Sequence, residues 1–188
     1  MVRRRVAIFG GSFNPPHVAH QMVCLWALST GRADEVWMVP CFEHAFDKAL
    51  VAYEHRREMC ELAAASFPTG AVQVSAIEAE LGGKSRTFVT VSSLCERYPD
   101  RDFSLLIGAD LVPEIASWHR ADELRELVDL IVVGRSGYEG PSGSAELAAI
   151  SSTKVRGALR KGADVSGWLP SGVVDYISRH GLYQDTET

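Results

Sequence analysis

The 188-residue chain lacks the features of several classes of protein. Its longest apolar runs are far shorter than the roughly 20 residues that a membrane helix needs. The net charge of −5 argues against a broad nucleic-acid surface, although it leaves room for a local anion pocket. The opening MVRRR leads into a short apolar run and a glycine turn, without a small-residue cleavage pattern. We therefore expect no targeting segment, no membrane partner and no nucleic-acid partner.

The chain also has few cysteines, and they are not spaced for a metal or redox site. Cys24, Cys41, Cys60 and Cys95 are scattered, without a CxxC pair. Three of the four lie in apolar surroundings and are expected to be buried, reduced packing residues. These features predict a cytoplasmic protein, and we predict no metal-ligating side chain.

Apolar runs of strand length alternate with segments of helical period along the chain. We expect strands at 5–9, 35–39, 72–75, 103–107 and 130–133, and helices at 17–30, 53–67, 87–98, 121–128, 152–161 and 171–180. Strands separated by helices imply parallel pairing with right-handed crossovers. The prediction is a doubly wound, mainly parallel α/β sheet of the Rossmann-like type, in a single domain over 1–188. A glycine- and serine-rich excursion is expected at 136–144.

The stretch FGGSFNPPHVAH, from Phe9 to His20, follows the first predicted strand. Gly10 and Gly11 lack Cβ atoms, so a phosphate can approach the backbone closely. A helix beginning near His17 offers free N–H groups that favour an anion. His17 and His20 share one face of its first turn and can donate to the same phosphate chain. The alternatives are a tight strand–helix connection or a zinc pair, although helical zinc pairs usually stand four residues apart.

A second polar motif, ISSTKVR, begins at Ile150. Hydroxyls at a helix start commonly cap free N–H groups, which is the simplest interpretation of this run. Three hydroxyls, on Ser151, Ser152 and Thr153, followed one turn later by Arg156, also make a phosphate clamp.

The first motif resembles the G-x-F-x-P-x-H-x-G-H pattern of the (H/T)xGH nucleotidyltransferase superfamily, with Ala19 in place of the usual glycine. The second is similar to the ISSTxIR signature of its nicotinate/nicotinamide mononucleotide adenylyltransferase branch. Further family-like segments extend the resemblance over essentially the whole chain: EHRREM at 54–59, SRTFVT at 85–90, IGAD at 107–110 and HGLY at 180–183.

The resemblance implies transfer of AMP from ATP to nicotinate mononucleotide, which gives deamido-NAD and pyrophosphate in NAD biosynthesis. It implies that His17, His20 and Arg156 are catalytic, that the helices at 152–180 complete the ATP site, and that Mg²⁺ accompanies ATP. The ATP-binding set that it implies also contains Gly10, Gly11, Ser12, Phe13, Gly108, Asp110, Ser151, Ser152 and Thr153.

For the pyridine substrate, the resemblance implies contacts from Lys48, Arg86, Thr87, Trp118 and Arg135. Arg86 replaces the family's usual tyrosine, and a guanidinium near the ring would favour nicotinate over nicotinamide mononucleotide. The alternatives are nicotinamide mononucleotide or phosphopantetheine as the acceptor, and a non-catalytic ATP-binding sensor. The sequence leaves open whether the protein forms a homo-oligomer.

Overall fold

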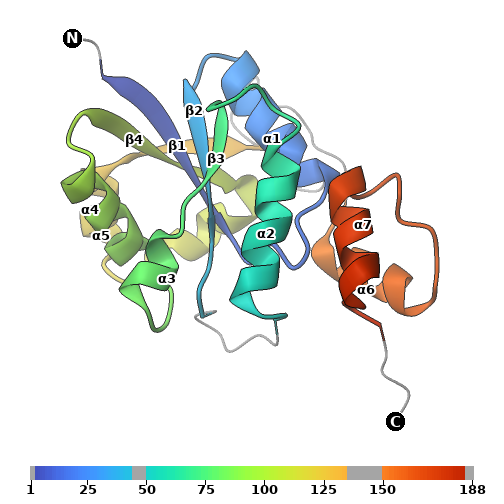
Figure 1. Cartoon of the computed structure of the whole chain (residues 1–188). Helices are drawn as coiled ribbons and strands as arrows, with labels where there is room; N and C mark the ends of the chain where they lie inside the picture. The colour runs from blue at the N-terminus through green and yellow to red at the C-terminus, as the bar shows by residue number, and fades with distance from the viewer. Residues whose placement is uncertain (1–2, 44–49, 135–149, 185–188) are drawn as a thin grey trace.

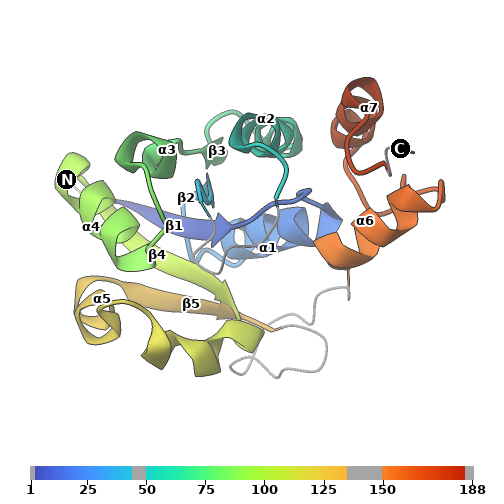
Figure 2. The same cartoon turned by 90° about the horizontal axis from the view of Figure 1, so that it is seen from below.

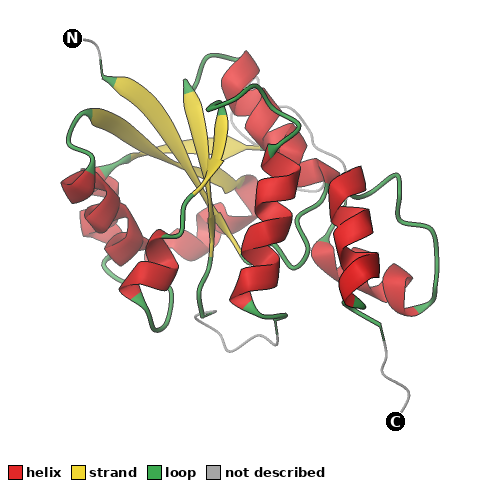
Figure 3. Ribbon diagram, in the orientation of Figure 1, coloured by secondary structure: helices red, strands yellow, loops and turns green. Residues whose placement is uncertain are grey.

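A computed structural model describes residues 3–43, 50–134 and 150–184 of the chain. Five strands form one parallel sheet in the order β3-β2-β1-β4-β5, and Figures 1 and 3 show this sheet between helical layers. The strands are β1 (Arg4–Gly11), β2 (Glu35–Pro40), β3 (Val72–Val74), β4 (Arg101–Gly108) and β5 (Asp129–Val133).

Two groups of helices cover the two faces of the sheet. One face carries α1 (Val18–Ser29) and α2 (Tyr53–Ala64). The other carries α3 (Ile77–Leu81), α4 (Thr87–Arg97), the 3₁₀ helix η1 (Ala109–Ser117) and α5 (Ala121–Leu127). The last two helices, α6 (Ser152–Arg160) and α7 (Ser171–His180), share an apolar cluster with α2 and lie together at one end of the molecule (Figures 1 and 2).

The strands supply side chains to both apolar layers. In β1, Ala7 and Phe9 join the cluster under α1 and α2, whereas Val6 and Ile8 join the cluster on the opposite face. All six residues of β2 are buried. Strands buried on both faces are typical of parallel sheets, and this is why their sequences are almost continuously apolar.

The strand order places a topological switch point between β1 and β4. The chain moves outward from β1 to β2 and β3, then returns to the other side of β1 as β4 and continues to β5. In open α/β sheets, ligands bind outside the carboxyl ends of the strands at such a point. Here those ends are Gly10 and Gly11 of β1 and Gly108 of β4.

The doubly wound parallel fold predicted from the sequence is confirmed, as are all five strands and six of the helices. The largest difference in an element's end is at α2, which we expected to reach Phe67 and which ends at Ala64. Two elements were not predicted, α3 and η1. The first has five residues, too few for a helical period to show, and the second contains Pro113. The glycine-rich excursion expected at 136–144 lies outside the described residues.

The cysteine prediction is only partly correct. All four thiols are free, but two of them, Cys24 and Cys60, are buried, whereas Cys41 and Cys95 are partly exposed. Burial raises the pKa of Cys24 to about 12. Within the described ranges, none of the helices has the length and apolar character required to cross a membrane.

Candidate active site

The two histidines of the first motif lie against each other at the start of α1. Their rings are stacked with centroids 3.7 Å apart, and His17 is the N-cap residue of the helix. The backbone N–H of His17 donates to Nδ1 of His20 over 3.0 Å. Because Nδ1 accepts, a neutral His20 ring carries its proton on Nε2. This hydrogen bond therefore leaves His20 with a fixed N–H donor on the ring edge opposite the backbone.

The ring of Phe13 packs against the ring of His20. Its ring meets the rings of Phe9 and His20 edge-on, with centroids 5.5 Å and 5.0 Å apart, and the residue is buried. Its φ of 45° lies in the left-handed region, which is uncommon for a residue with a side chain. A Cβ on Gly11 would come within 3.1 Å of the Phe13 ring, whereas a Cβ on Gly10 would meet nothing within 4 Å. Gly11 thus makes room for Phe13, and Gly10 leaves open space beside the backbone.

The second motif contacts the first directly, although the two are far apart in sequence. The Ser152 hydroxyl donates to the Pro15 carbonyl over 2.9 Å, and Nη1 of Arg156 donates to the Asn14 carbonyl over 2.8 Å. The other terminal nitrogen of Arg156 lies 3.4 Å from the Thr153 hydroxyl. The starts of α1 and α6 are consequently neighbours, as Figure 2 shows.

Ser151 has the capping role that the simplest interpretation of ISST predicts. It is the N-cap residue of α6, and its hydroxyl accepts from the backbone N–H of Lys154 over 3.3 Å. Capping and a phosphate clamp are compatible here, because Ser152, Thr153 and Arg156 make other contacts.

Residues near the end of the chain also bond the loop between β1 and α1, and these contacts were not predicted from the sequence. The Tyr183 hydroxyl donates to Oδ1 of the buried Asn14 over 2.8 Å. The backbone N–H of Val18 donates to the Trp168 carbonyl over 2.9 Å. Burial raises the pKa of Tyr183, and the nearby charge of Arg156 only partly opposes that rise. The hydroxyl of Tyr183 therefore stays protonated and able to donate at neutral pH.

The carboxyl end of β4 lies beside β1 and brings further predicted residues to the same edge of the sheet. The Asp110 carboxylate bends back over Gly108, where any Cβ would collide with its Oδ1. Trp118 follows η1, is partly buried, and packs against the apolar cluster that contains Ile107 and Ile115. The gap at Gly108 is thus occupied by the carboxylate of Asp110.

The residues predicted for the pyridine substrate are only partly described. Thr87 is the first residue of α4 and is partly buried, and Arg86 precedes it as the N-cap residue. Arg86 is exposed, so its guanidinium gives no structural argument for a carboxylate on the substrate. Lys48 and Arg135 lie outside the described residues.

Two charged residues near this edge had no role assigned from the sequence. Arg56 is 1% exposed and bonds backbone carbonyls, and Glu78 of the unpredicted α3 accepts from backbone and hydroxyl groups. Burial raises the pKa of the Cys41 thiol even though the Arg56 charge opposes this. Cys41 is therefore mostly protonated at neutral pH and is a poor nucleophile.

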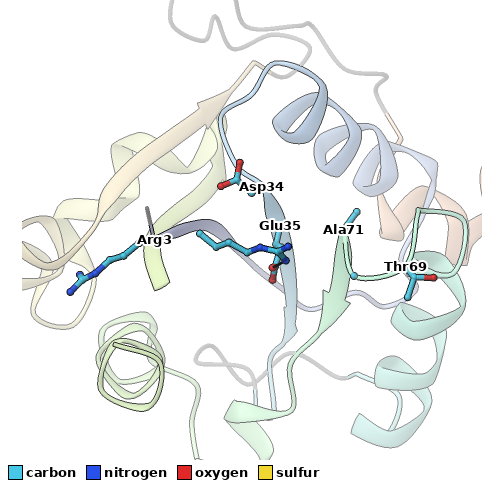
Figure 4. Close-up of a pocket in the computed structure, with 7 residues that line it drawn as sticks. Arg3, Asp34, Glu35, Thr69 and Ala71 are labelled. Atoms are coloured by element: carbon cyan, nitrogen blue, oxygen red, sulfur yellow. Dashed lines mark hydrogen bonds and ion pairs between the residues drawn. The ribbon is translucent and has the colours of Figure 1, made fainter. Parts of the chain in front are cut away.

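A hollow of about 480 Å³ lies at the opposite, amino edge of the sheet (Figure 4). It is lined by residues at the starts of β1, β2 and β3: Arg3, Arg4, Asp34, Glu35, Thr69, Gly70 and Ala71. Glu35 already accepts from four side chains here, and none of the predicted site residues reaches this edge among those the structure describes. The switch point at the carboxyl edge remains the candidate site.

Comparison with known proteins identifies the family of this chain. A family model described as cytidylyltransferase-like matches residues 8–158. The probable nicotinate-nucleotide adenylyltransferase of Anaeromyxobacter dehalogenans is 45% identical over 96% of this chain and 97% of its own. The protein of the same name from Myxococcus xanthus is 38% identical over 95% of this chain and 94% of its own.

Solved structures show the same fold. The Plasmodium falciparum nicotinic acid mononucleotide adenylyltransferase, complexed with NaAD, has a TM-score of 0.80 to this chain. The match covers 96% of this chain and 97% of that one at 22% sequence identity, so it bears on the fold alone. The family model and the curated relatives, by contrast, share sequence over most of the chain. The chain therefore belongs to the cytidylyltransferase-like nucleotidyltransferases, in their nicotinate-nucleotide adenylyltransferase branch.

Proposed function

We propose that the protein transfers AMP from ATP to nicotinate mononucleotide, giving deamido-NAD and pyrophosphate. The observation that carries this proposal is the junction between the two motifs. Arg156 and Ser152 of α6 bond the carbonyls of Asn14 and Pro15, immediately before the stacked pair His17 and His20. Curated relatives up to 45% identical over nearly the whole chain carry the name of this activity.

The junction suits a triphosphate. Two helices begin beside each other there, and the positive end of each helix dipole favours an anion. Nε2 of His20 is oriented as a donor, and we assign it to the α-phosphate, with His17 beside it. We assign Ser152, Thr153 and Arg156 to the β- and γ-phosphates. Ser12 and Phe13 supply backbone contacts along the turn, and the open space at Gly10 admits the phosphate chain.

The reaction depends on the positioning of its two substrates and needs no general base. The nucleophile is a phosphate oxygen of nicotinate mononucleotide, which is already ionised at neutral pH. It forms a bond to the α-phosphorus of ATP while the bond to the bridging oxygen breaks and pyrophosphate leaves. Stabilising the charge on these oxygens is the main task of the protein. The His20 donor and the Arg156 guanidinium are suited to it.

For the acceptor, we place the pyridine nucleotide beside Thr87 and Trp118, whose ring can stack on the pyridine. Lys48 and Arg135 remain predicted ligands of the substrate phosphate. The choice of nicotinate over nicotinamide rests on the curated relatives, because Arg86 is exposed.

Mg²⁺ is proposed to arrive with ATP, where it would neutralise part of the phosphate charge. The described residues include no group of three or more His, Cys, Asp and Glu side chains that could hold an ion by themselves. They fit an ion held mainly by phosphates and water. The Asp110 carboxylate, at the start of η1 just after β4, would accept from such a water or from the ribose.

A cytoplasmic location and the absence of a nucleic-acid partner remain predictions from the cysteine pattern and the charge.

Pyrophosphate release with ATP and each acceptor in parallel tests the function. Nicotinate mononucleotide should give the largest kcat/KM, nicotinamide mononucleotide a smaller value and phosphopantetheine none, with deamido-NAD identified by mass. Tight ATP binding without pyrophosphate from any acceptor would instead support the ATP-sensor alternative.

A further inference from the structure

The side chain of Arg56 joins three separate segments at the carboxyl edge of the sheet. Its Nη1 donates to the carbonyls of Ser12 over 3.1 Å and Cys41 over 2.7 Å. Its Nη2 donates to the Phe42 carbonyl over 3.1 Å, and its Nε to the Val51 carbonyl over 3.0 Å. The guanidinium therefore ties the loop after β1 to the loop after β2 and to the approach to α2.

Glu78 holds the same loop after β2 from the other side. Its Oε2 accepts from the Phe42 backbone N–H over 3.1 Å and from the Ser85 hydroxyl. The Ser85 oxygen accepts from the same Phe42 N–H over 3.0 Å. Its Oε1 accepts from the Thr90 hydroxyl over 2.8 Å. The Ser85 N–H in turn donates to the Glu43 carbonyl over 3.0 Å. Glu78 thus links Phe42 to the segment that opens α4.

Phe42 is consequently held at both of its backbone polar atoms by side chains of opposite charge. Arg56 donates to its carbonyl, and its N–H is shared between Glu78 and the Ser85 hydroxyl that is bonded to Glu78. Arg56 and Glu78 come from different faces of the sheet. A buried guanidinium and a partly buried carboxylate are costly to desolvate unless hydrogen bonds satisfy them. Removing Arg56 leaves loop carbonyls without this donor, and removing Glu78 leaves the Phe42 N–H with the Ser85 hydroxyl alone.

We propose that Arg56 and Glu78 are positioning residues that set the spacing between the ATP loop and the pyridine-binding segment. Arg56 reaches the ATP loop at Ser12, and Glu78 reaches the start of α4 beside Thr87. Neither side chain needs to touch a substrate. The inference rests on the proposed function for the identity of the two ligands, but the link through Phe42 stands on the hydrogen bonds alone.

Kinetics of two variants and two matched controls test this role. Glu78→Gln replaces an oxygen that accepts from Phe42, Ser85 or Thr90 by a donor, so the α4 segment should shift. We expect the KM for nicotinate mononucleotide to rise roughly tenfold, equivalent to about 1.4 kcal/mol, with the KM for ATP changed less than about twofold. Arg56→Lys keeps the charge but cannot reach all four carbonyls. It should raise both KM values and lower kcat by roughly tenfold or more.

The controls are neighbouring residues of the same charge. Arg57 follows Arg56 on α2, is partly exposed and pairs with Glu61, and Glu80 on α3 is partly exposed and pairs with Arg97. Arg57→Lys and Glu80→Gln should leave both KM values within about twofold of the parent enzyme. A merely structural role for Glu78 would lower thermal stability and the active fraction while leaving both KM values unchanged, and that result would overturn the proposal.

Hydrogen exchange gives a readout that does not depend on activity. The Phe42 N–H has two acceptors, so the double variant Glu78→Gln with Ser85→Ala should speed exchange at this amide more than Ser85→Ala alone, with no change in Glu80→Gln. Unchanged exchange at Phe42 would contradict the proposed link. If the Gln variant does not fold, Ser85→Ala removes one partner of Glu78 and one acceptor of the Phe42 N–H, and it should raise the same KM by a smaller factor. A parent protein that releases no pyrophosphate would overturn the proposed function and leave the exchange result to decide the link.

Discussion

At the amino edge of the sheet, a buried carboxylate bonds two guanidinium groups, whereas at the carboxyl edge the guanidinium groups of two arginines bond backbone carbonyls. At the amino edge, the buried Glu35 accepts from Arg4 over 2.5 Å and from Arg101, Trp37 and Gln73 over 3.1 Å each. These contacts join four strands around one carboxylate, and the acidic group has oppositely charged partners.

At the carboxyl edge, the guanidinium groups of Arg56 and Arg156 donate to the carbonyls of the loops. A carbonyl satisfies hydrogen bonds without cancelling the positive charge. The bonds that shape the loops therefore leave the positive charge of Arg156 in place beside two helix starts. This difference indicates that the contacts at the amino edge stabilise the fold, whereas the carboxyl edge can attract a polyanion.

The largest effect should come from removing the oriented donor at the carboxyl edge. We expect His20→Ala to lower kcat/KM by roughly 10²–10³, because it removes a group that stabilises charge in the transition state. The unfolding temperature should change little, since His20 is only partly buried. His180→Ala, on the exposed end of α7, is the control and should keep activity near that of the parent. Near-normal turnover in His20→Ala would remove the histidine from the mechanism.

Arg156→Ala should have the next largest effect. It removes both the charge proposed for the leaving pyrophosphate and the bond to the Asn14 carbonyl, and we expect kcat/KM for ATP to fall by roughly 10². Arg156→Lys should recover only part of this loss, because lysine lacks the planar fork. Arg160→Ala, one turn further along α6, is the matched control. A full recovery by lysine would mean that the geometry of the guanidinium is unimportant.

Gly10→Ala sharpens the comparison by separating stability from binding. A Cβ at this position meets nothing within 4 Å, so the free energy of unfolding should stay the same or rise slightly. If the phosphates occupy that space, the dissociation constant of an ATP analogue should rise roughly tenfold, as calorimetry can measure. Unchanged binding would place the triphosphate elsewhere.

Glu35→Gln should affect stability at the amino edge and leave kinetics within about twofold, the smallest effect on activity. Loss of the ion pairs should cost roughly 1–3 kcal/mol of unfolding free energy near pH 7, measured by denaturant titration. Burial opposes ionisation of Glu35, but hydrogen bonds from Arg4 and Trp37 and the charge of Arg101 outweigh it, so its pKa is lowered.

The pH dependence of that effect has a definite sign. A lowered pKa in the folded state gives stability that is full above the pKa of the unfolded chain, about 4.3 for glutamate, and is lost as the pH falls through the folded value. The difference in the free energy of unfolding between the parent protein and Glu35→Gln should therefore shrink below about pH 4. Asp34→Asn, which breaks the exposed pair with Arg5, is the control and should show a smaller gap. A difference in unfolding free energy between the parent and Glu35→Gln that stays constant from pH 3 to 7 would contradict this account.

The sequence was most informative where a residue's role depends on its neighbours in the chain. The strand and helix periods, the glycine turn before His17 and the hydroxyl run before Arg156 are local signals, and they predicted the fold and where the site would lie. Arg56 lay in a predicted helix and in the family-like EHRREM segment, and Glu78 lay in the unpredicted helix α3, but neither had a role assigned from the sequence. Their partners are backbone atoms of distant loops, which no local pattern reveals. Asn14 is similar, because its partner Tyr183 is 169 residues away.

A crystal structure with a non-hydrolysable ATP analogue tests most directly whether residues from both ends of the chain contact the same triphosphate. We predict that the α-phosphate lies within hydrogen-bonding distance of Nε2 of His20, and that the β- and γ-phosphates reach Arg156 and the hydroxyls at the start of α6. Two results would contradict this prediction. The analogue could bind in the hollow at the amino edge, or it could bind the histidines while Arg156 stays on the Asn14 carbonyl and contacts no phosphate.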